Sequence, residues 1–354
     1  MPPAPAVFLS YSGVLGGAER ILLDGAMRLG APAAVACPEG PLAAAARAAG
    51  LPVRVLRERT LQLRSGPAAT AAHAAGLAGL AVDAARMGSG PAALVAWGAR
   101  AILACALVPR SHRAPLLAVH CDLPPEGAPG RALRAATGRA DGVAALSHAI
   151  AAATAPGATV LHPGVDLVAW TPAPLPGGPP RALVLGALVA WKRADLGLEI
   201  AARVPGLRLE LAGAAMPGDD GGFLAGLQRR AAAADLRDRV RFLGPVADPR
   251  PALARAHLLL HCSDAEPYGL ALVEALAAGR PVVAPGSGGP PEIVSDGAGR
   301  LFAAGDAEAG AEAVRAVLAD PAAPAAARAR AEAQFDIRRS TERLRAAIAA
   351  LTSG

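Results

Sequence analysis

Two glutamates in the stretch EPYGLALVEALAAG, residues 266–279, lie eight positions apart and have the chemistry to bind a polar ligand. Proline is well tolerated at the first position of a helix, so we expect a helix to begin between residues 267 and 269. Glu266 then lies beside the helix N-terminus, whose free N–H groups attract anions, and Glu274 lies inside the helix. Eight helical residues span about 12 Å, so the carboxylates would grip two ends of one elongated polar ligand, with an anionic group between them at the helix start. A ligand with a sugar hydroxyl, a phosphate and a ribose would satisfy this layout. The alternative is that Glu266 complements the helix dipole and Glu274 faces solvent.

A glycine loop could bring the backbone close to a phosphate. SGVLGGAER, residues 12–20, lies between the first expected strand and the first expected helix. There Gly16 and Gly17 would let the backbone approach an anion at a helix N-terminus. The spacing is not GxGxxG, so the dinucleotide fingerprint is absent. A second glycine-rich loop at 286–297 supplies Gly288, Gly289 and Glu292 after another expected strand, and an ordinary glycine-rich turn is the alternative.

Two basic residues lie at the carboxyl ends of expected strands, where α/β folds expose reactive groups. Lys192 is the only lysine of the chain and follows the run LVLGALVAW. As a compact point charge it suits a diphosphate, although a chance position on a loop is the alternative. His120 ends the run LLAVH, where it could donate to a sugar hydroxyl or help to hold a leaving phosphate. A purely structural histidine is the alternative.

Zinc is the least favoured chemistry for the histidines. His120 and His261 are each followed by a cysteine, Cys121 and Cys262 respectively. Adjacent residues of a strand point to opposite faces, so neither pair can easily chelate one ion. The 4 cysteines of the chain also lack a CxxC spacing, which favours a reducing cytoplasm.

The order of elements predicts the fold class. Short apolar runs such as AVFLSYS, LLAVH and HLLLHCS alternate with longer alanine-rich stretches of helical composition. This alternation is typical of βαβ units in a parallel sheet, with ligands at the carboxyl ends of the strands. The run WTPAPLPGGPP interrupts the pattern at residues 170–180, and the pattern then restarts.

We therefore predict an α/β protein of two Rossmann-like, doubly wound domains with a cleft between them, which suits 354 residues. The most apolar run, AALVAWGARAILACALVP, contains Arg100 and is expected to be a buried helix or a strand followed by a helix, not a membrane span. The start MPPAPAVFLS lacks the charged region of a signal peptide. The predicted parts are an N-terminal domain 1–168, a Pro/Gly-rich linker 169–180, a C-terminal domain 181–335 and a C-terminal helix 336–354 that packs back on the N-terminal domain.

The net charge of +6 narrows the choice of partners. Part of the excess lies in RVLRERTLQLR, which contains Arg54, Arg57, Arg59 and Arg64. These residues could face an anionic acceptor or a lipid surface, and a solvated face is the alternative. Nucleic acid is not an expected partner, because only 3% of the residues are aromatic and the basic residues are not interleaved with them.

Taken together, these features resemble the family 4 retaining glycosyltransferases of the GT-B fold, or glycosyltransferase group 1. The resemblance covers the chain, weakly between residues 40 and 110 and most strongly from 240 to 320, where VRFLGPVAD, EPYGLALVEALAAG and GRLFAAGD follow one another. Glu266 and Glu274 match the family's E-x7-E signature. LGGAERILLDGA resembles the acceptor-side loop, and VLHPGVD resembles the inter-domain NGVD segment, with Pro163 in place of the usual Asn.

The resemblance implies roles for the residues that match. Glu266 would bind the hydroxyls of the donor sugar and Glu274 those of the ribose. Lys192 would stabilise the departing nucleotide diphosphate, and His120 would lie at the donor sugar. Such enzymes need no bound metal, in line with the missing Asp-x-Asp motif. The implied donor-binding residues are Gly16, Gly17, Ala187, Lys192, Arg193, Tyr268, Gly269, Leu270 and Glu274.

One position departs from the family pattern. Family members usually carry an arginine after the glycine of the segment that matches LGAL, and this arginine shares the diphosphate with the lysine. The residue here is Ala187. Because one phosphate cation is missing, stabilisation of the leaving group would suffer unless Arg193 substitutes for it.

The predicted function is transfer of a sugar from a UDP- or GDP-linked donor to a hydroxyl acceptor, with retention of configuration. In the family's usual mechanism the leaving diphosphate assists the incoming hydroxyl, so no protein nucleophile is named. The acceptor, bound by the N-terminal domain, would be a small molecule, a glycan or a lipid-linked molecule, with peripheral association at the inner face of a membrane. The alternatives are a nucleotide-sugar epimerase on the same scaffold and a catalytically weakened sugar-nucleotide binder.

Overall fold

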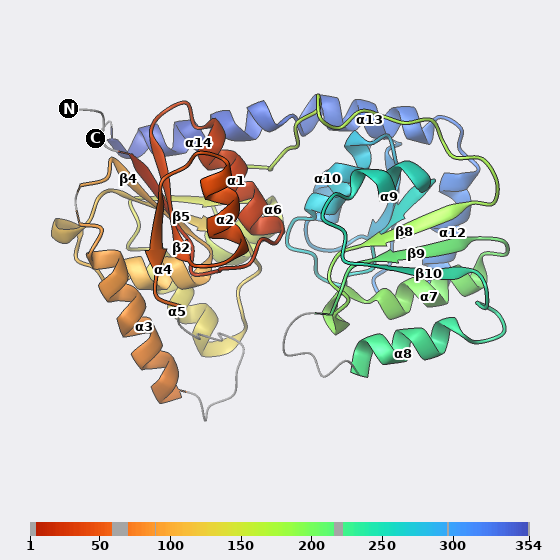
Figure 1. Ribbon diagram of the computed structural model, residues 1–354, viewed down its shortest axis with the longest axis horizontal. Coiled ribbons are helices and arrows are strands. Elements are labelled where there is room, and N and C mark those ends of the chain that lie inside the picture. Colours follow the sequence, from red (N-terminus) through yellow and green to blue (C-terminus); the bar gives the residue numbers. More distant parts are fainter. Residues whose placement is uncertain (1–4, 59–69, 89, 216–221, 296, 353–354) are drawn as a thin grey trace. The chain divides into compact units, whose positions relative to one another are not determined.

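A computed structural model of the chain describes residues 5–58, 70–88, 90–215, 222–295 and 297–352. The chain forms two compact units: Met1–Pro163 together with Arg338–Gly354, and Gly164–Ile337. Each unit is a parallel β-sheet covered by helices (Figure 1). The segment 169–180 lies within the second unit, and its role as a linker stays a prediction.

The first unit has a sheet in the order β3-β2-β1-β4-β5-β6-β7, with every described pairing parallel. Sequential strands run outward from β1 in both directions, as in a doubly wound fold. The strands are β1 (Ala6–Leu9), β2 (Ala33–Pro38), β3 (Val53–Leu56), β4 (Ala93–Trp97), β5 (Leu116–His120), β6 (Gly142–Ala145) and β7 (Thr159–Val160). The helices are α1 (Gly17–Arg28), α2 (Pro41–Ala48), α3 (Thr70–Ala85), α4 (Ala99–Ala106), α5 (Gly127–Thr137) and α6 (His148–Thr154), with a 3₁₀ turn at Arg110–His112.

The second unit repeats this plan in the order β10-β9-β8-β11-β12-β13, again with parallel pairings. Its strands are β8 (Arg181–Leu185), β9 (Arg208–Ala212), β10 (Val240–Gly244), β11 (Leu258–Leu260), β12 (Val282–Pro285) and β13 (Gly299–Phe302). Its helices are α7 (Ala194–Arg203), α8 (Gly222–Ala231), α9 (Arg250–Arg255), α10 (Leu270–Ala277), α11 (Pro290–Ile293), α12 (Ala307–Leu318) and α13 (Ala323–Gln334), with a 3₁₀ turn at Ala190–Lys192. The predicted α/β class with two doubly wound domains is therefore confirmed.

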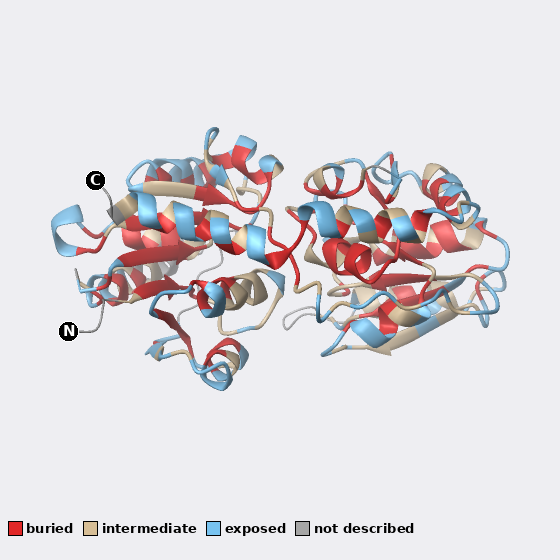
Figure 2. Cartoon of the chain, turned by 90° about the horizontal axis from the view of Figure 1, so that it is seen from above, coloured by how far each residue is buried: buried red, intermediate tan, exposed pale blue. Residues whose placement is uncertain are grey.

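Burial explains why the central strands read as unbroken apolar runs. Every residue of β1, β4 and β5 is buried, because helices cover both faces of a parallel sheet (Figure 2). The run that contains Arg100 forms the strand β4 followed by the helix α4, one of the two forms predicted for it. No described helix is both long enough and apolar enough to cross a membrane.

The edge strand β3 was missed by the sequence analysis. Three of its four residues are not buried, so it lacks the apolar signal of the central strands. The basic segment begins on this strand, where Arg54 is exposed, and continues to the exposed Arg57. Arg59 and Arg64 lie outside the described residues.

The last helix, α14 (Ile337–Thr352), packs on the first unit. The Leu344 Cδ2 atom lies only 2.7 Å from where a Cβ on Gly25 would be, so glycine makes room for the leucine. The Arg345 guanidinium donates to the Leu29 carbonyl over 2.8 Å. The C-terminal residues thus complete a unit that begins more than 300 positions earlier in the chain.

A buried arginine holds the Pro/Gly-rich segment against the second unit. Arg280 is 1% exposed and donates to the carbonyls of Ala173 at 2.9 Å, Pro174 at 3.1 Å and Leu253 at 3.0 Å. Proline-rich backbone forms no regular pattern of hydrogen bonds, so its carbonyl groups need other donors. The five N–H donors of a guanidinium can supply them. This part of the predicted linker is therefore fixed by hydrogen bonds to its own unit.

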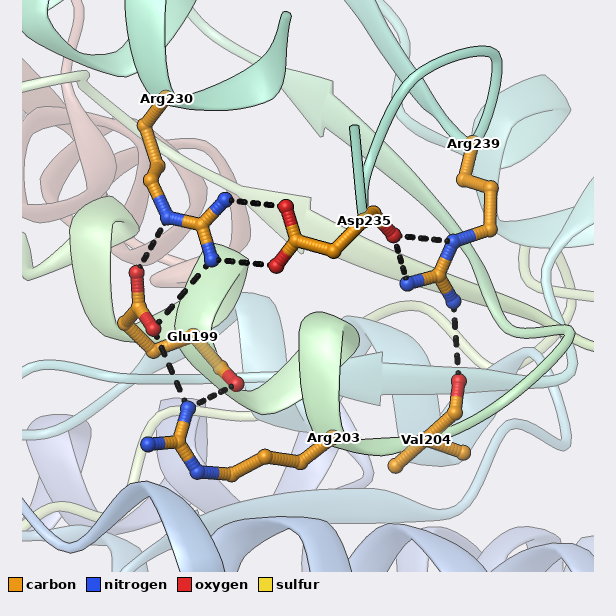
Figure 3. A network of polar contacts seen from close by, with 6 residues as sticks. All are labelled: Glu199, Arg203, Val204, Arg230, Asp235 and Arg239. Atoms are coloured by element: carbon orange, nitrogen blue, oxygen red, sulfur yellow. Dashed lines mark hydrogen bonds and ion pairs between the residues drawn. The ribbon is translucent and has the colours of Figure 1, made fainter. Parts of the chain in front are cut away.

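A network of charges ties α7 to α8 and to the loop before β10 (Figure 3). Arg230 contacts Glu199 at 2.6 Å and Asp235 at 2.8 Å, and Arg203 contacts Glu199 at 3.1 Å. Arg239 donates to the Asp235 carbonyl over 3.0 Å. Arg230 pairs with two carboxylates, Arg203 pairs with Glu199 on its own helix, and Arg239 donates to backbone carbonyls. We therefore assign the network to structure.

Candidate functional site

The strand order of the second unit fixes where a ligand can bind. β8 is followed along the chain by β9 on one side, whereas β11 pairs with β8 on the other side, so the order reverses between them. Loops that leave such a switch point diverge and open a crevice at the carboxyl ends of the strands. The loops after β8 and β11 carry Lys192 and Glu266, two of the predicted catalytic residues.

The loop after β8 presents Lys192 on a rigid turn. The 3₁₀ turn Ala190–Lys192 ends at Arg193, which has a left-handed backbone with φ of 54°. The Ser263 hydroxyl donates to the Trp191 carbonyl over 3.3 Å and so joins the two loops of the switch point. Lys192 Nζ lies 4.2 Å from the centre of the Trp191 ring, in a cation–π contact. The lysine is thereby held in front of the loop that follows β11.

Lys192 and Glu266 form an ion pair through Nζ and Oε2. Glu266 is buried, and burial alone would raise the pKa of its carboxyl. The nearby His261 imidazole and the Lys192 ammonium outweigh that effect and lower the pKa of Glu266 to about 2. Glu266 is therefore a carboxylate at neutral pH. Among the described residues none donates a hydrogen bond to its second oxygen, Oε1, which leaves this atom able to accept one from a ligand hydroxyl.

The second glycine-rich loop packs closely against the backbone of Glu266. The Gly289 N–H donates to the Glu266 carbonyl over 2.8 Å. A Cβ on Gly288, which has φ of 69°, would lie 2.2 Å from the same carbonyl oxygen, and a Cβ on Gly289 would lie 2.4 Å from the Tyr268 carbonyl oxygen. Only glycine allows this close approach, so the packing of the loop against this backbone requires both glycines.

Helix α10 carries the second predicted glutamate. It begins at Leu270 after Gly269, which has φ of 106°, so its start is one residue beyond the predicted range. Tyr268 is 3% exposed and Glu274 is 8% exposed. The alternative that Glu274 faces solvent is therefore wrong. Its predicted role at the ribose stays a prediction.

Arg193 is the residue that the sequence offers in place of the arginine missing at position 187. The Arg193 guanidinium contacts Asp264 Oδ2 at 2.7 Å and Asp195 Oδ2 at 3.1 Å. These partners, Asp264 first, raise the pKa of Arg193. A guanidinium shared by two carboxylates is less available to a diphosphate. Substitution of Arg193 for the cation that Ala187 lacks stays a prediction.

His120 ends β5 in the first unit and is almost fully buried. Its Nε2 lies 3.0 Å from Thr137 Oγ1, and the Thr137 hydroxyl donates to the Leu133 carbonyl over 2.8 Å. Because the hydroxyl has only one hydrogen, Nε2 must be the donor to Oγ1. Burial lowers the pKa of His120 to about 4, so the ring is neutral at pH 7 and Nδ1 carries the lone pair. A ligand at Nδ1 would meet an acceptor, whereas the sequence analysis expected a donor.

The first glycine loop is only partly open to an anion. Gly16 precedes α1 and its N–H donates to Glu19 Oε2 over 3.1 Å, so an acidic side chain already occupies this position. Gly17 begins the helix, and a Cβ there would meet no atom within 4 Å. The described packing therefore does not require glycine at position 17.

His261 was considered in the sequence only as a zinc ligand and is a residue that sequence reasoning missed. It follows β11 directly and its Nε2 lies 3.3 Å from Glu266 Oε2. Its place at the carboxyl end of a strand beside the switch point, the same argument that singled out His120, was the signal that could have found it.

Comparisons with known proteins agree with the fold. Residues 172–334 match the family described as Glycosyl transferases group 1. A D-inositol 3-phosphate glycosyltransferase of Mycolicibacterium paratuberculosis is 37% identical over 189 residues, which are 49% of this chain and 42% of that protein. A lipopolysaccharide core biosynthesis glycosyltransferase, LpsE of Rhizobium meliloti, is 35% identical over 146 residues, 41% of each chain. The chain thus spans less than half the length of these curated relatives.

Solved structures match over nearly the whole chain. The structure of Anabaena Alr3699/HepE in complex with UDP and glucose has a TM-score of 0.82 at 25% identity and covers 99% of this chain and 100% of that one. A glycosyltransferase from Rickettsia africae has a TM-score of 0.80 at 15% identity, which shows the fold alone. The chain therefore has the two-domain GT-B fold of these glycosyltransferases. Its segment 172–334 matches the glycosyl transferases group 1 family, and this match includes the residues 240–320 over which the resemblance is strongest.

Proposed function

We propose that the chain is a retaining glycosyltransferase that moves a hexose from a UDP-linked donor to a hydroxyl of an acceptor. The observation that carries the proposal is the pair of Lys192 and Glu266 at the switch point of the second unit. It places a cation and a buried carboxylate side by side, and a nucleotide sugar needs both, one for its diphosphate and one for its hydroxyls. The likeness to the Anabaena protein, which was crystallised in complex with UDP and glucose, favours UDP as the nucleotide.

In this proposal each side chain has one task. Lys192 neutralises the diphosphate as negative charge develops on its leaving oxygen, and Glu266 accepts hydrogen bonds from the sugar hydroxyls through Oε1. The bond from the anomeric carbon to the phosphate oxygen breaks, and a bond to the acceptor oxygen forms on the same face. The proton of the acceptor hydroxyl passes to the leaving phosphate oxygen. No nucleophile or metal is assigned to the chain.

The acceptor is proposed only as a class. The curated relatives are named for an inositol phosphate and for a lipopolysaccharide core, both rich in hydroxyl groups. We propose a small polyhydroxylated molecule, a glycan or a lipid-linked glycan, bound by the first unit. The exposed Arg54 and Arg57 support an anionic acceptor or a peripheral contact with an anionic membrane, in a cytoplasmic setting.

The test is release of nucleoside diphosphate from UDP-glucose, UDP-galactose, UDP-N-acetylglucosamine and GDP-mannose, with and without inositol phosphate or glycan acceptors. We expect UDP release from one UDP-sugar. In Glu266→Ala and Lys192→Ala variants its kcat should fall roughly 100-fold or more. Proton NMR of the product then reports the anomeric configuration, and an inverted product would refute retention.

A catalytically weakened binder is the second candidate, because Ala187 supplies no cation and Arg193 is held by two acids. This candidate predicts UDP binding by calorimetry without UDP release from any of these donors. Binding of no nucleotide at all would overturn both candidates.

A further inference from the structure

His261 has a buried nitrogen that its surroundings leave without a hydrogen bond. Its backbone N–H donates to the Val283 carbonyl over 2.8 Å, so the residue continues the β11 ladder and its position is fixed. The side chain is 8% exposed, and Nε2 has no hydrogen-bond partner in the part of the chain that the structure describes. Buried polar atoms in folded proteins are almost always paired, so an unpaired one calls for a functional explanation.

The nearest acceptor to this nitrogen is the carboxylate of the candidate site. Glu266 Oε2 lies 3.3 Å from Nε2 but is not aligned with it as a hydrogen bond. The same Oε2 forms the ion pair with Lys192. Two donors, Lys192 Nζ and His261 Nε2, thus lie near Glu266 Oε2, and only the lysine forms a hydrogen bond with it.

The two donors differ in freedom. Lys192 is 24% exposed and ends a flexible four-carbon stem, so its ammonium can turn toward a second anion. His261 is buried at the end of a strand and can turn only about its own side-chain bonds. A diphosphate would attract the ammonium more strongly than one carboxylate does, because it carries more negative charge. Glu266 would then be a buried carboxylate without its ion partner, which is strongly unfavourable.

We propose that His261 is a positioning residue that takes over Glu266 Oε2 when Lys192 turns to the diphosphate, and so keeps Oε1 directed at the donor sugar. The proposal rests on the proposed function, because it needs a diphosphate at Lys192. Nε2 carries the hydrogen in this exchange, since a carboxylate only accepts. The hydrogen bond from His261 then offsets the free energy that is lost when Lys192 leaves its ion pair with Glu266.

Isothermal calorimetry and NMR titration of four variants test this exchange with two probes, UDP and uridine. A Gln side chain places its amide nitrogen near the position of Nε2, whereas Asn places it near Nδ1. We expect His261→Asn to weaken UDP binding about 10-fold and His261→Gln to stay within about 3-fold of wild type. Uridine has no phosphate to attract Lys192, so its affinity should not change.

The carboxylate itself provides the matched control. In a Glu266→Gln background no charge is left behind when Lys192 turns away, so adding His261→Asn should cost less than twofold in UDP affinity. If His261 were merely structural, His261→Asn would weaken the binding of UDP and of uridine alike, and would do so in the wild-type and Glu266→Gln backgrounds. Weaker uridine binding, or an equal loss of UDP affinity in both backgrounds, overturns the proposal while leaving the function intact. A wild type that does not bind UDP would instead overturn the proposed function.

The wild-type protein gives a measurement that does not depend on a folded Asn variant. The ¹⁵N resonance of His261 Nε2, assigned by its loss in His261→Gln, should shift toward the value of a hydrogen-bonded N–H on addition of UDP and stay in place with uridine. An unchanged resonance at saturating UDP contradicts the exchange.

Discussion

His120 shows how burial and one hydroxyl set the state of a histidine. Nε2 is committed as a donor to Thr137, which already donates its own hydrogen to Leu133. If the residue acts at a sugar, as the resemblance implies, it does so as a neutral ring that accepts through Nδ1. Protonation would add a hydrogen at Nδ1 and place a charge in the interior of the first unit.

His120→Gln gives a pH test of this state. The folded pKa of about 4 lies below the usual histidine pKa of 6.5, so the unfolded chain binds the proton first and stability falls as the pH drops from 6.5 to 4. Above pH 6.5 the contribution is fully present. Gln can keep the bond to Thr137 but does not titrate, so its unfolding free energy should fall less over this window, by up to about 3 kcal/mol. Urea unfolding from pH 7.5 to 4 measures the difference, and parallel curves would refute a buried neutral His120.

At position 187 the chain has alanine where the family resemblance implies an arginine that binds the diphosphate. Ala187→Arg should tighten UDP binding roughly 10-fold, because a charged hydrogen bond to phosphate contributes about 1.5 kcal/mol or more. Ala187→Gln is the matched control, since it adds length without charge and should change little. Calorimetry with UDP gives both values. Equal affinities for the Arg variant and wild type would mean that the diphosphate does not reach this loop.

At the scale of elements, glycines let the loop after β12 touch the loop after β11. Gly289→Ala would place a Cβ 2.4 Å from the Tyr268 carbonyl oxygen and push the backbone that carries Glu266. We expect a loss of stability of about 1–3 kcal/mol, as for other overpacked sites, together with UDP binding at least 10-fold weaker. Gly177→Ala is the control in the same unit, because a Cβ there meets no atom within 4 Å. Wild-type UDP affinity in Gly289→Ala would show that this contact does not position the site.

The same elements show what could be predicted from the sequence. Buried strands such as β4 and β5 have a strong apolar signal, and Glu266, Glu274 and Lys192 stand out by type and spacing, so fold class and site region followed from local patterns. The edge strand β3 has mixed polarity and was missed. Contacts between distant segments left no local trace, such as the pairing of Arg193 with Asp264, 71 positions apart. His261 lies near Glu266 in the sequence, but its burial beside that carboxylate depends on the folded chain.

At the scale of the whole molecule, the last segment of the chain, Arg338–Gly354, belongs to the first unit. Leu344 of α14 is 3% exposed and fills the space that Gly25 leaves on α1. The C-terminal helix is thus a part of the first unit's core, although the second unit precedes it in the sequence. Stability of the first unit should therefore depend on residues that the second unit does not need.

Leu344→Ala separates the two units in a thermal unfolding experiment. Loss of a buried leucine side chain costs about 2–5 kcal/mol, and this cost should fall on the transition of the first unit alone. UDP at about 100 times its Kd should add about 2.7 kcal/mol to the second unit, which carries Lys192 and Glu266. Calorimetric scans with and without UDP measure both shifts, and Glu342→Ala, an exposed change on the same helix, is the control. If Leu344→Ala lowers both transitions together, the units unfold as one and cannot be assigned separate stabilities.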